Sequence, residues 1–179
     1  ADQVIRCSME LGGNAPFVVL DDANIEEAVK GLMMAKMRNG GAACTAANRI
    51  YVARSIGDKF IAEFSKAMAA LKMGVGREAG TQLGASVSMK ERNKIAELVD
   101  AAKAGGAKVH LGGTTPDGAG AFYPATVLEV AKDDAILAEE VFGPVAPVVL
   151  FDTDEEALKL ANDTEYGLIS YVYSEDLKR

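Results

Sequence analysis

The sequence predicts an α/β protein in which an open, mostly parallel sheet lies between two layers of helices, a three-layer αβα arrangement. Short apolar runs typical of strands alternate along the 179 residues with segments whose apolar residues recur at helical spacing. One run, residues 145–151, is apolar throughout, as expected for a buried central strand of a parallel sheet. Strands that alternate with helices favour parallel pairing, with helices on both faces of the sheet.

The strands follow from the apolar runs. The expected strands are residues 4–9, 16–20, 49–53, 108–111, 123–130, 145–151 and 169–173.

The helices follow from apolar residues spaced three and four apart. They are expected from residue 25 to about 36, around residues 60–71, around residues 95–102 and over residues 154–161. In the last of these, Ala157, Leu158 and Ala161 are expected to face inward. Gly40 and Gly41 end the first helix pattern, and Gly105 with Gly106 closes the third.

The organisation of the chain predicts one domain over residues 1–179, because no repeat, low-complexity tract or linker interrupts it. Residues 174–176 resemble the start of a further helix. The chain is therefore expected to be a piece of a longer protein.

Composition disfavours several classes of partner. A net charge of −7 disfavours nucleic acid. No apolar run reaches the roughly 18 residues of a membrane span, and the first residues do not resemble a signal peptide. Two cysteines without a CxxC motif and a single histidine indicate neither a disulfide framework nor a metal site. A reducing, cytoplasmic location is the expectation.

Cys44 is the first candidate for chemistry. It follows Gly40, Gly41 and two alanines, so the backbone can turn tightly and little bulk surrounds the thiol. A small electrophile could reach a thiol placed in this way. The alternative is a buried cysteine that acts as a small hydrophobic residue.

Two carboxylates are further candidates. Glu10 precedes a glycine pair at the end of the first expected strand, where open α/β sheets place ligands. It could act as a general base on water; otherwise it is a solvated loop acid. Glu140 lies two residues before Phe142, so a carboxylate for a ribose and a ring for a flat ligand stand together. A solvated helix end followed by a Gly-Pro turn is the alternative.

Together these segments resemble the aldehyde dehydrogenase superfamily in order and separation. The matching segments are ELGGNAP from Glu10, the glycine-rich stretch that ends in Cys44, EVFGP from Glu140, GAFYPAT from Gly120 and NDTEYGL from Asn162. The resemblance covers essentially the whole chain. It implies the catalytic domain of such an enzyme, with the corresponding αβα fold.

The resemblance also implies a role for each candidate residue. Cys44 is the nucleophile that attacks an aldehyde, and its backbone N–H is one donor of the oxyanion hole. Glu10 activates the water that releases the acid. Glu140 binds the nicotinamide ribose of NAD or NADP, and Phe142 packs near the nicotinamide ring.

Arg38 carries the substrate prediction. It lies six residues before Cys44, in a segment that resembles succinate-semialdehyde dehydrogenases, where an arginine at this place holds the substrate carboxylate. The expected reaction is thus the oxidation of succinate semialdehyde to succinate. The alternative for Arg38 is a cation that stabilises the end of a helix.

The chain also departs from its relatives. Ala42 replaces a longer polar residue of many relatives, and Ala46 replaces a second cysteine of some succinate-semialdehyde dehydrogenases, so no local disulfide switch is available.

Parts of the relatives are missing from this chain. The cofactor-binding domain, the asparagine of the oxyanion hole and the oligomerisation arm of the family are absent, and so is a GxGxxG motif. On its own the chain is expected to be inactive, and the full-length protein to be a homo-oligomer. The choice between NAD and NADP stays open. So do another small aldehyde as substrate and a non-catalytic α/β assembly domain.

Overall fold

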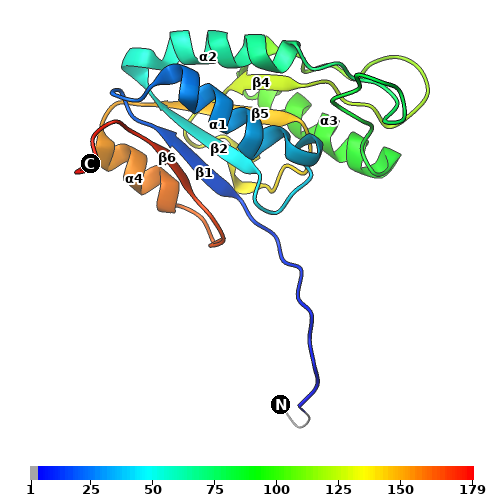
Figure 1. Ribbon diagram of the computed structural model, residues 1–179, viewed down its shortest axis with the longest axis horizontal. Helices are drawn as coiled ribbons and strands as arrows, with labels where there is room; N and C mark the ends of the chain where they lie inside the picture. The colour runs from blue at the N-terminus through cyan, green and yellow to red at the C-terminus, as the bar shows by residue number, and fades with distance from the viewer. Residues whose placement is uncertain (1–3) are drawn as a thin grey trace.

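A single six-stranded sheet organises the chain in the computed structural model, which describes residues 4–179 (Figure 1). The strands are β1 (Ala15–Val19), β2 (Ala47–Ala53), β3 (Lys108–Leu111), β4 (Thr126–Glu129), β5 (Val145–Phe151) and β6 (Tyr171–Tyr173). Their order is β3-β4-β5-β2-β1-β6, and only the β3–β4 pair is antiparallel. The predicted open, mostly parallel sheet is confirmed.

Four helices cover the two faces of this sheet (Figure 1). They are α1 (Ile25–Met37), α2 (Arg54–Ala69), α3 (Met89–Ala104) and α4 (Asp154–Asn162). Asn24, Ser88 and Thr153 cap the N-termini of α1, α3 and α4 by accepting a backbone N–H. Helices α1 and α4 begin and end within one residue of their predicted bounds, whereas α2 and α3 begin at residues 54 and 89, six residues before the residues predicted for them.

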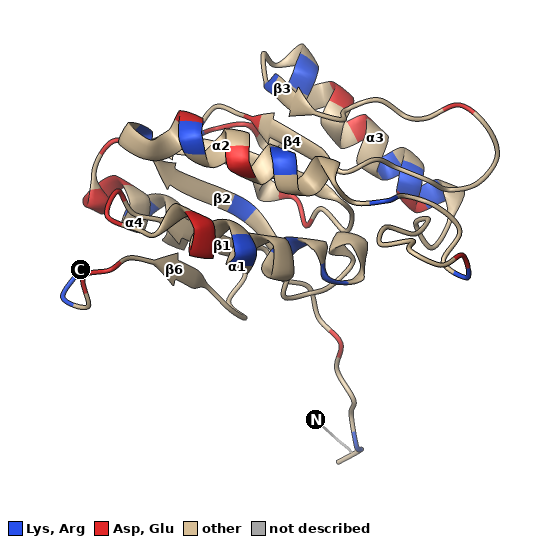
Figure 2. Cartoon of the chain, turned by 45° about the horizontal axis from the view of Figure 1, so that its top comes forward, with Lys and Arg blue, Asp and Glu red and all other residues tan. Residues whose placement is uncertain are grey.

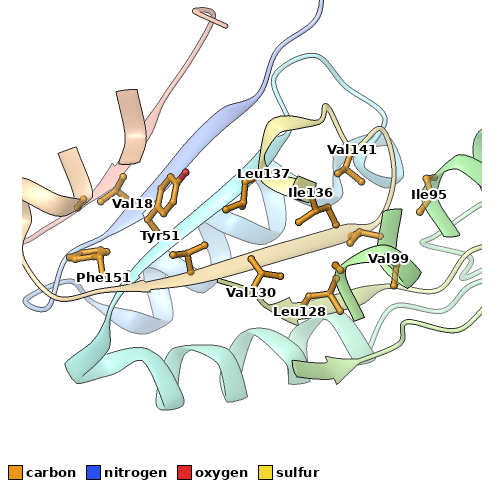
Figure 3. Packing of buried hydrophobic residues seen from close by; sticks show 14 of the residues in the cluster. Val18, Tyr51, Ile95, Val99, Leu128, Val130, Ile136, Leu137, Val141 and Phe151 are labelled. Carbon is orange, nitrogen blue, oxygen red and sulfur yellow. The ribbon is translucent and has the colours of Figure 1, made fainter. Parts of the chain in front are cut away.

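Two hydrophobic clusters form the core, one on each face of the sheet. Residues of α1 and α2 pack on one face against inward positions of the strands, with Phe17 and Ile50 among them. Residues of α3, α4 and the short turn Ala135–Ala138 (η2) pack on the other, where Val18, Tyr51 and Phe151 point (Figure 3). The three-layer αβα arrangement is therefore as predicted.

Residues 4–9 correct the strand predicted there. They form no regular structure, and they run away from the body of the molecule (Figure 1). Val4, Ile5 and Met9 are exposed. A strand needs a neighbour for its backbone groups, and within the described chain this segment has none.

Helix α4 differs from its prediction in one inward residue. Ala157 is buried and Ala161 packs against the core as expected, but Leu158 is exposed and Leu160 takes the inward place. Positions 157, 160 and 161 follow the three- and four-residue spacing of a single helix face, and 158 does not share it.

The end of the chain also differs from the helix that residues 174–176 suggested. It forms a turn, held by the carboxylate of Asp22, which accepts hydrogen bonds from the Ser174 hydroxyl and from the backbone N–H groups of Glu175 and Asp176.

Acidic and basic residues lie mostly on the helices and loops, with few on the central strands (Figure 2). Within residues 4–179, no helix is long and apolar enough to cross a membrane.

Candidate active site

Three of the sequence motifs meet at one edge of the sheet. Gly13 lies two residues before β1, Cys44 lies shortly before β2, and Glu140 lies shortly before β5. These strands are parallel neighbours in the order β5-β2-β1, so the segments that lead into them lie side by side. This edge holds the amino-terminal ends of the strands. The expectation that Glu10 follows a strand at the opposite, carboxyl-terminal edge is wrong, because no strand forms before it.

Gly13 is the point where the three segments touch. Its backbone N–H donates to Oε1 of Glu140 at 2.9 Å. A Cβ atom on Gly13 would lie 2.1 Å from the carbonyl oxygen of Cys44, far inside van der Waals contact. The segment can pass between Glu140 and the Cys44 backbone only because Gly13 has no side chain.

The loop that carries Cys44 owes its shape to a run of left-handed residues. In the turn Arg38–Gly41 (η1), Asn39, Gly40 and Gly41 have φ of 53°, 63° and 82°. The Asn39 side chain donates to the carbonyl of Ala42 at 2.8 Å and holds the turn. Sequence alone indicated that glycines would break the helix here, and the structure agrees.

The same loop rests on the segment that follows Glu140. A Cβ atom on Gly41 would lie 2.1 Å from the carbonyl oxygen of Gly143, so the two backbones are in direct contact. Cys44 itself is a free thiol that is partly exposed. The structure therefore does not bury Cys44 fully, and its role as nucleophile stays a prediction.

Glu10 is not brought to Cys44 in the structure. It is exposed on the extended segment before β1, and no hydrogen bond or ion pair joins it to another of residues 4–179. Its neighbour in sequence, Gly12, lies against Glu140, since a Cβ atom there would be 2.8 Å from Oε2. The role of Glu10 as a base stays a prediction.

Phe142 lines a cavity of about 610 Å³, whereas Glu140, two residues before it, is not among the lining residues. The cavity is lined by the Cys44 loop at Asn39, Gly40 and Ala42, and by Phe142, whose ring is 43 % exposed. Glu140 is half-buried, and Oε1 is engaged by Gly13. The roles of Glu140 at the ribose and of Phe142 at the nicotinamide ring stay predictions.

Arg38 lies close to the nucleophile loop. The positive charge of Arg38 acts on the hydroxyl of Tyr171, which contacts this loop. Burial raises the pKa of Tyr171, and both the hydrogen bond to Thr45 and the charge of Arg38 oppose that rise. The Tyr171 hydroxyl donates at 2.9 Å to the carbonyl of Thr45, the residue after Cys44.

The charge of Arg38 has no partner in residues 4–179, where no carboxylate forms an ion pair with it. It caps α1 only through its backbone. An exposed guanidinium at the end of α1 is compatible with both interpretations, so the substrate role of Arg38 stays a prediction.

Two buried cations escaped the sequence analysis. The guanidinium of Arg49 donates to the carbonyl oxygens of Asn14 at 2.8 Å, Leu160 at 3.0 Å and Ala161 at 3.1 Å, and so joins the start of β1 to the end of α4. Lys36 is fully buried on α1. The signal for Lys36 was present, because position 36 continues the inward spacing of the helix, whereas nothing in the strand pattern marked Arg49.

No metal centre is apparent at this edge or elsewhere in residues 4–179, where no group of three or more His, Cys, Asp and Glu side chains is placed to hold an ion.

The comparisons with known proteins identify the family of the chain. The model of the aldehyde dehydrogenase family matches residues 1–179. The chain is 51 % identical over 177 residues to succinate-semialdehyde dehydrogenase of Paenarthrobacter nicotinovorans, covering 98 % of this chain and 39 % of that protein. It is 42 % identical over 179 residues to glutarate-semialdehyde dehydrogenase of Pseudomonas putida, covering 100 % and 37 %.

A solved structure gives the same result for the fold. The crystal structure of succinate-semialdehyde dehydrogenase from Burkholderia pseudomallei matches with a TM-score of 0.92 at 40 % identity, over 96 % of this chain and 36 % of that chain. This chain thus spans less than two fifths of the length of these relatives. The family suggested by the sequence motifs is confirmed: the chain belongs to the aldehyde dehydrogenase family.

Proposed function

We propose that this chain supplies the nucleophile of an aldehyde dehydrogenase that oxidises a small, carboxylate-bearing aldehyde to the acid with NAD or NADP. The contact of Gly13 with both Cys44 and Glu140 carries the proposal, because it places the thiol loop beside the carboxylate assigned to the cofactor ribose. Succinate semialdehyde is the proposed substrate, and glutarate semialdehyde, with the same two end groups, is the nearest alternative.

The proposed reaction begins at the sulfur of Cys44. The thiolate attacks the aldehyde carbon to give a thiohemiacetal, and the backbone N–H of Cys44 donates to the oxygen that becomes negative. When bound, NAD or NADP supplies the hydride acceptor that turns this adduct into a thioester. Glu10 then takes a proton from water, which attacks the thioester carbon and releases the acid and the Cys44 thiolate.

The role of Glu10 needs the segment before β1 to bend over Cys44. Gly13 already touches the Cys44 backbone, and three residues of extended chain span roughly 10 Å. The proposed role of Glu10 therefore requires a change of backbone angles between Glu10 and Gly13 that carries the carboxylate to the sulfur. Leu11 and Gly12 are both exposed, and Gly12 also lies against Glu140.

The whole reaction needs the remainder of a full-length enzyme. A suitable assay uses a chimera in which this chain replaces the matching segment of the Paenarthrobacter nicotinovorans relative. We expect succinate semialdehyde to drive the reduction of NAD or NADP, followed by absorbance. A folded chimera that oxidises no aldehyde, while the parent enzyme does, would argue for the non-catalytic assembly domain.

Arg38 provides the test of substrate class. In the chimera, Arg38→Leu removes a charge-assisted pair with the substrate carboxylate, which is worth about 1.5–3 kcal/mol. We expect kcat/KM for succinate semialdehyde to fall roughly 10- to 150-fold, and kcat/KM for a neutral aldehyde of equal length to change little. Arg77→Leu, which removes an exposed arginine from a loop, is the matched control. Equal losses for both aldehydes would return Arg38 to a structural role.

A further inference from the structure

Lys36 occupies a position where the fold calls for an apolar residue. It continues the buried face of α1 that contains Ala28, Val29 and Leu32, and its side chain is completely buried. Lysine is almost never fully buried without a partner of opposite charge. Core packing alone therefore does not explain a lysine at this position.

The contacts of the Lys36 ammonium group are neutral oxygens. Nζ donates to Oδ1 of Asn48 at 2.7 Å and lies 3.4 Å from the carbonyl oxygen of Val141. Asn48 is itself buried. No carboxylate within residues 4–179 forms an ion pair with Lys36. Burial alone lowers the pKa of Lys36 to about 7.

The two oxygens belong to the two chain segments that meet at the candidate active site, one after Cys44 and the other after Glu140. Asn48 follows Cys44 at the start of β2, and Val141 is bonded to Glu140. Lys36 also directly precedes the turn that leads to Cys44. The backbone of Gly41 touches that of Gly143 nearby, so the ammonium group lies where the Cys44 loop meets the segment that follows Glu140.

We propose that Lys36 is a positioning residue of this site, whose buried ammonium group ties the Cys44 loop to the Glu140 segment at the expense of fold stability. The proposal rests on the proposed function, because it assigns the tie to the alignment of nucleophile and cofactor. A buried charge without a counter-charge costs stability, and an apolar residue of similar size often restores it. The fold would be more stable with methionine at position 36.

The charged groups near Lys36 either have other partners or are exposed. On β2, Arg49 bonds backbone carbonyls at the end of α4. In the segment before β5, Glu139 pairs with Lys94, and Glu140 accepts the N–H of Gly13. On the turn after α1, Arg38 is exposed. None of these groups forms a hydrogen bond or an ion pair with Lys36. Lys36 is thus the titratable group buried at this junction.

The titration of Lys36 predicts how stability depends on pH. Below about pH 7, Lys36 is protonated in the folded and the unfolded chain, and the fold bears the full cost of the buried charge. Between about 7 and 10.5, the unfolded chain holds a proton that the folded chain has released. Stability contributed by this group therefore rises with pH across that interval.

The test compares Lys36→Met with Lys30→Met in the 179-residue chain. Lys30 lies on the same helix but is exposed. Urea unfolding from pH 6 to 10 is expected to show that Lys36→Met stabilises the chain at pH 6. This advantage in the unfolding constant should shrink by up to about tenfold per pH unit above pH 7. Lys30→Met should show no such advantage.

Amide hydrogen exchange supplies the readout that packing alone would not move. Despite its greater global stability, Lys36→Met should exchange about tenfold faster in residues 42–46 and 139–143, and no faster in α2. Unchanged exchange in these two segments would overturn the proposal. So would acceleration along the whole chain, which would mean a general loss of stability.

Asn48→Asp keeps an acceptor for the ammonium group and adds a counter-charge. It should leave exchange in both segments within about twofold and remove most of the pH dependence, because the pKa of Lys36 would return toward its usual value. Acceleration as large as that in Lys36→Met would instead assign the effect to altered packing and overturn the tie.

The same variant in the chimera links the tie to catalysis. Lys36→Met should lower kcat roughly 10- to 100-fold with a smaller effect on KM, since misplaced reacting groups lose rate. An unchanged kcat would overturn the positioning role. If the chimera with Lys36 intact were inactive, the proposed function would fail, whereas the exchange result, obtained without substrate, would stand on its own.

Discussion

Replacing Cys44 with serine in the chimera is expected to abolish acid formation, with a loss on the order of 10³-fold or more. A hydroxyl is a far weaker nucleophile than a thiolate near neutral pH, and the remainder of the site supplies no second thiol. The measurement is steady-state reduction of NAD or NADP with succinate semialdehyde. The fold should be unaffected, because Cys44 is partly exposed and serine is similar in size.

Cys7 is the matched control for this substitution. It is the other free cysteine, it is exposed, and its thiol contacts only the carbonyl of Ile5 at 3.8 Å among the described residues. Cys7→Ser should retain full activity. If Cys44→Ser oxidised the aldehyde as fast as Cys7→Ser, the assignment of the nucleophile would be wrong.

The second large effect is expected at Gly13. A methyl group there would lie 2.1 Å from the Cys44 carbonyl oxygen, so Gly13→Ala must displace the nucleophile loop or the segment before β1. Crowding of this kind costs about 1–3 kcal/mol, which corresponds to a fall in Tm of roughly 2–10 °C for a chain of this size. Displacement of the thiol by about 1 Å can lower the rate roughly 100-fold.

Gly76→Ala tests whether the effect is local. Gly76 has no atom within 4 Å of an added Cβ, and its backbone does not require glycine. It should leave both Tm and kcat/KM near those of the unmodified chimera. Normal activity in Gly13→Ala would show that the contact between Gly13 and Cys44 does not hold the site together.

The sequence predicted the elements of this fold because each carries its own local signal. Apolar runs marked β1, β2 and β5, and apolar residues at helical spacing marked α1 and α4. The strand expected at residues 4–9 failed for a physical reason. Its apolar residues are typical of a strand, but a strand is completed by its neighbour, and local pattern does not reveal whether a neighbour exists.

The sequence named candidate residues for the site, but it did not predict how they are arranged. The motifs named Cys44 and Glu140, yet the contact that joins them passes through Gly13, and only the topology β5-β2-β1 brings the three together. Each motif precedes a strand, so the order of parallel strands would have placed them at one edge.

Lys36 was missed because a lysine at an inward position of a helix contradicts the pattern used to find the core. Such a violation of local rules is itself a signal of function. Its meaning came only from the two oxygens it contacts, which belong to Asn48 and Val141 and lie far apart in sequence.

The most direct test of the central claim is to identify the residue that carries the acyl group during turnover. In the chimera with Glu10→Gln, hydride transfer should proceed but hydrolysis of the thioester should slow, because the general base is lost. After succinate semialdehyde and NAD or NADP are added and the reaction is stopped with acid, mass spectrometry of the peptides should find a succinyl group on Cys44. A succinyl group on another residue, or turnover with Cys44 never acylated, would contradict the account.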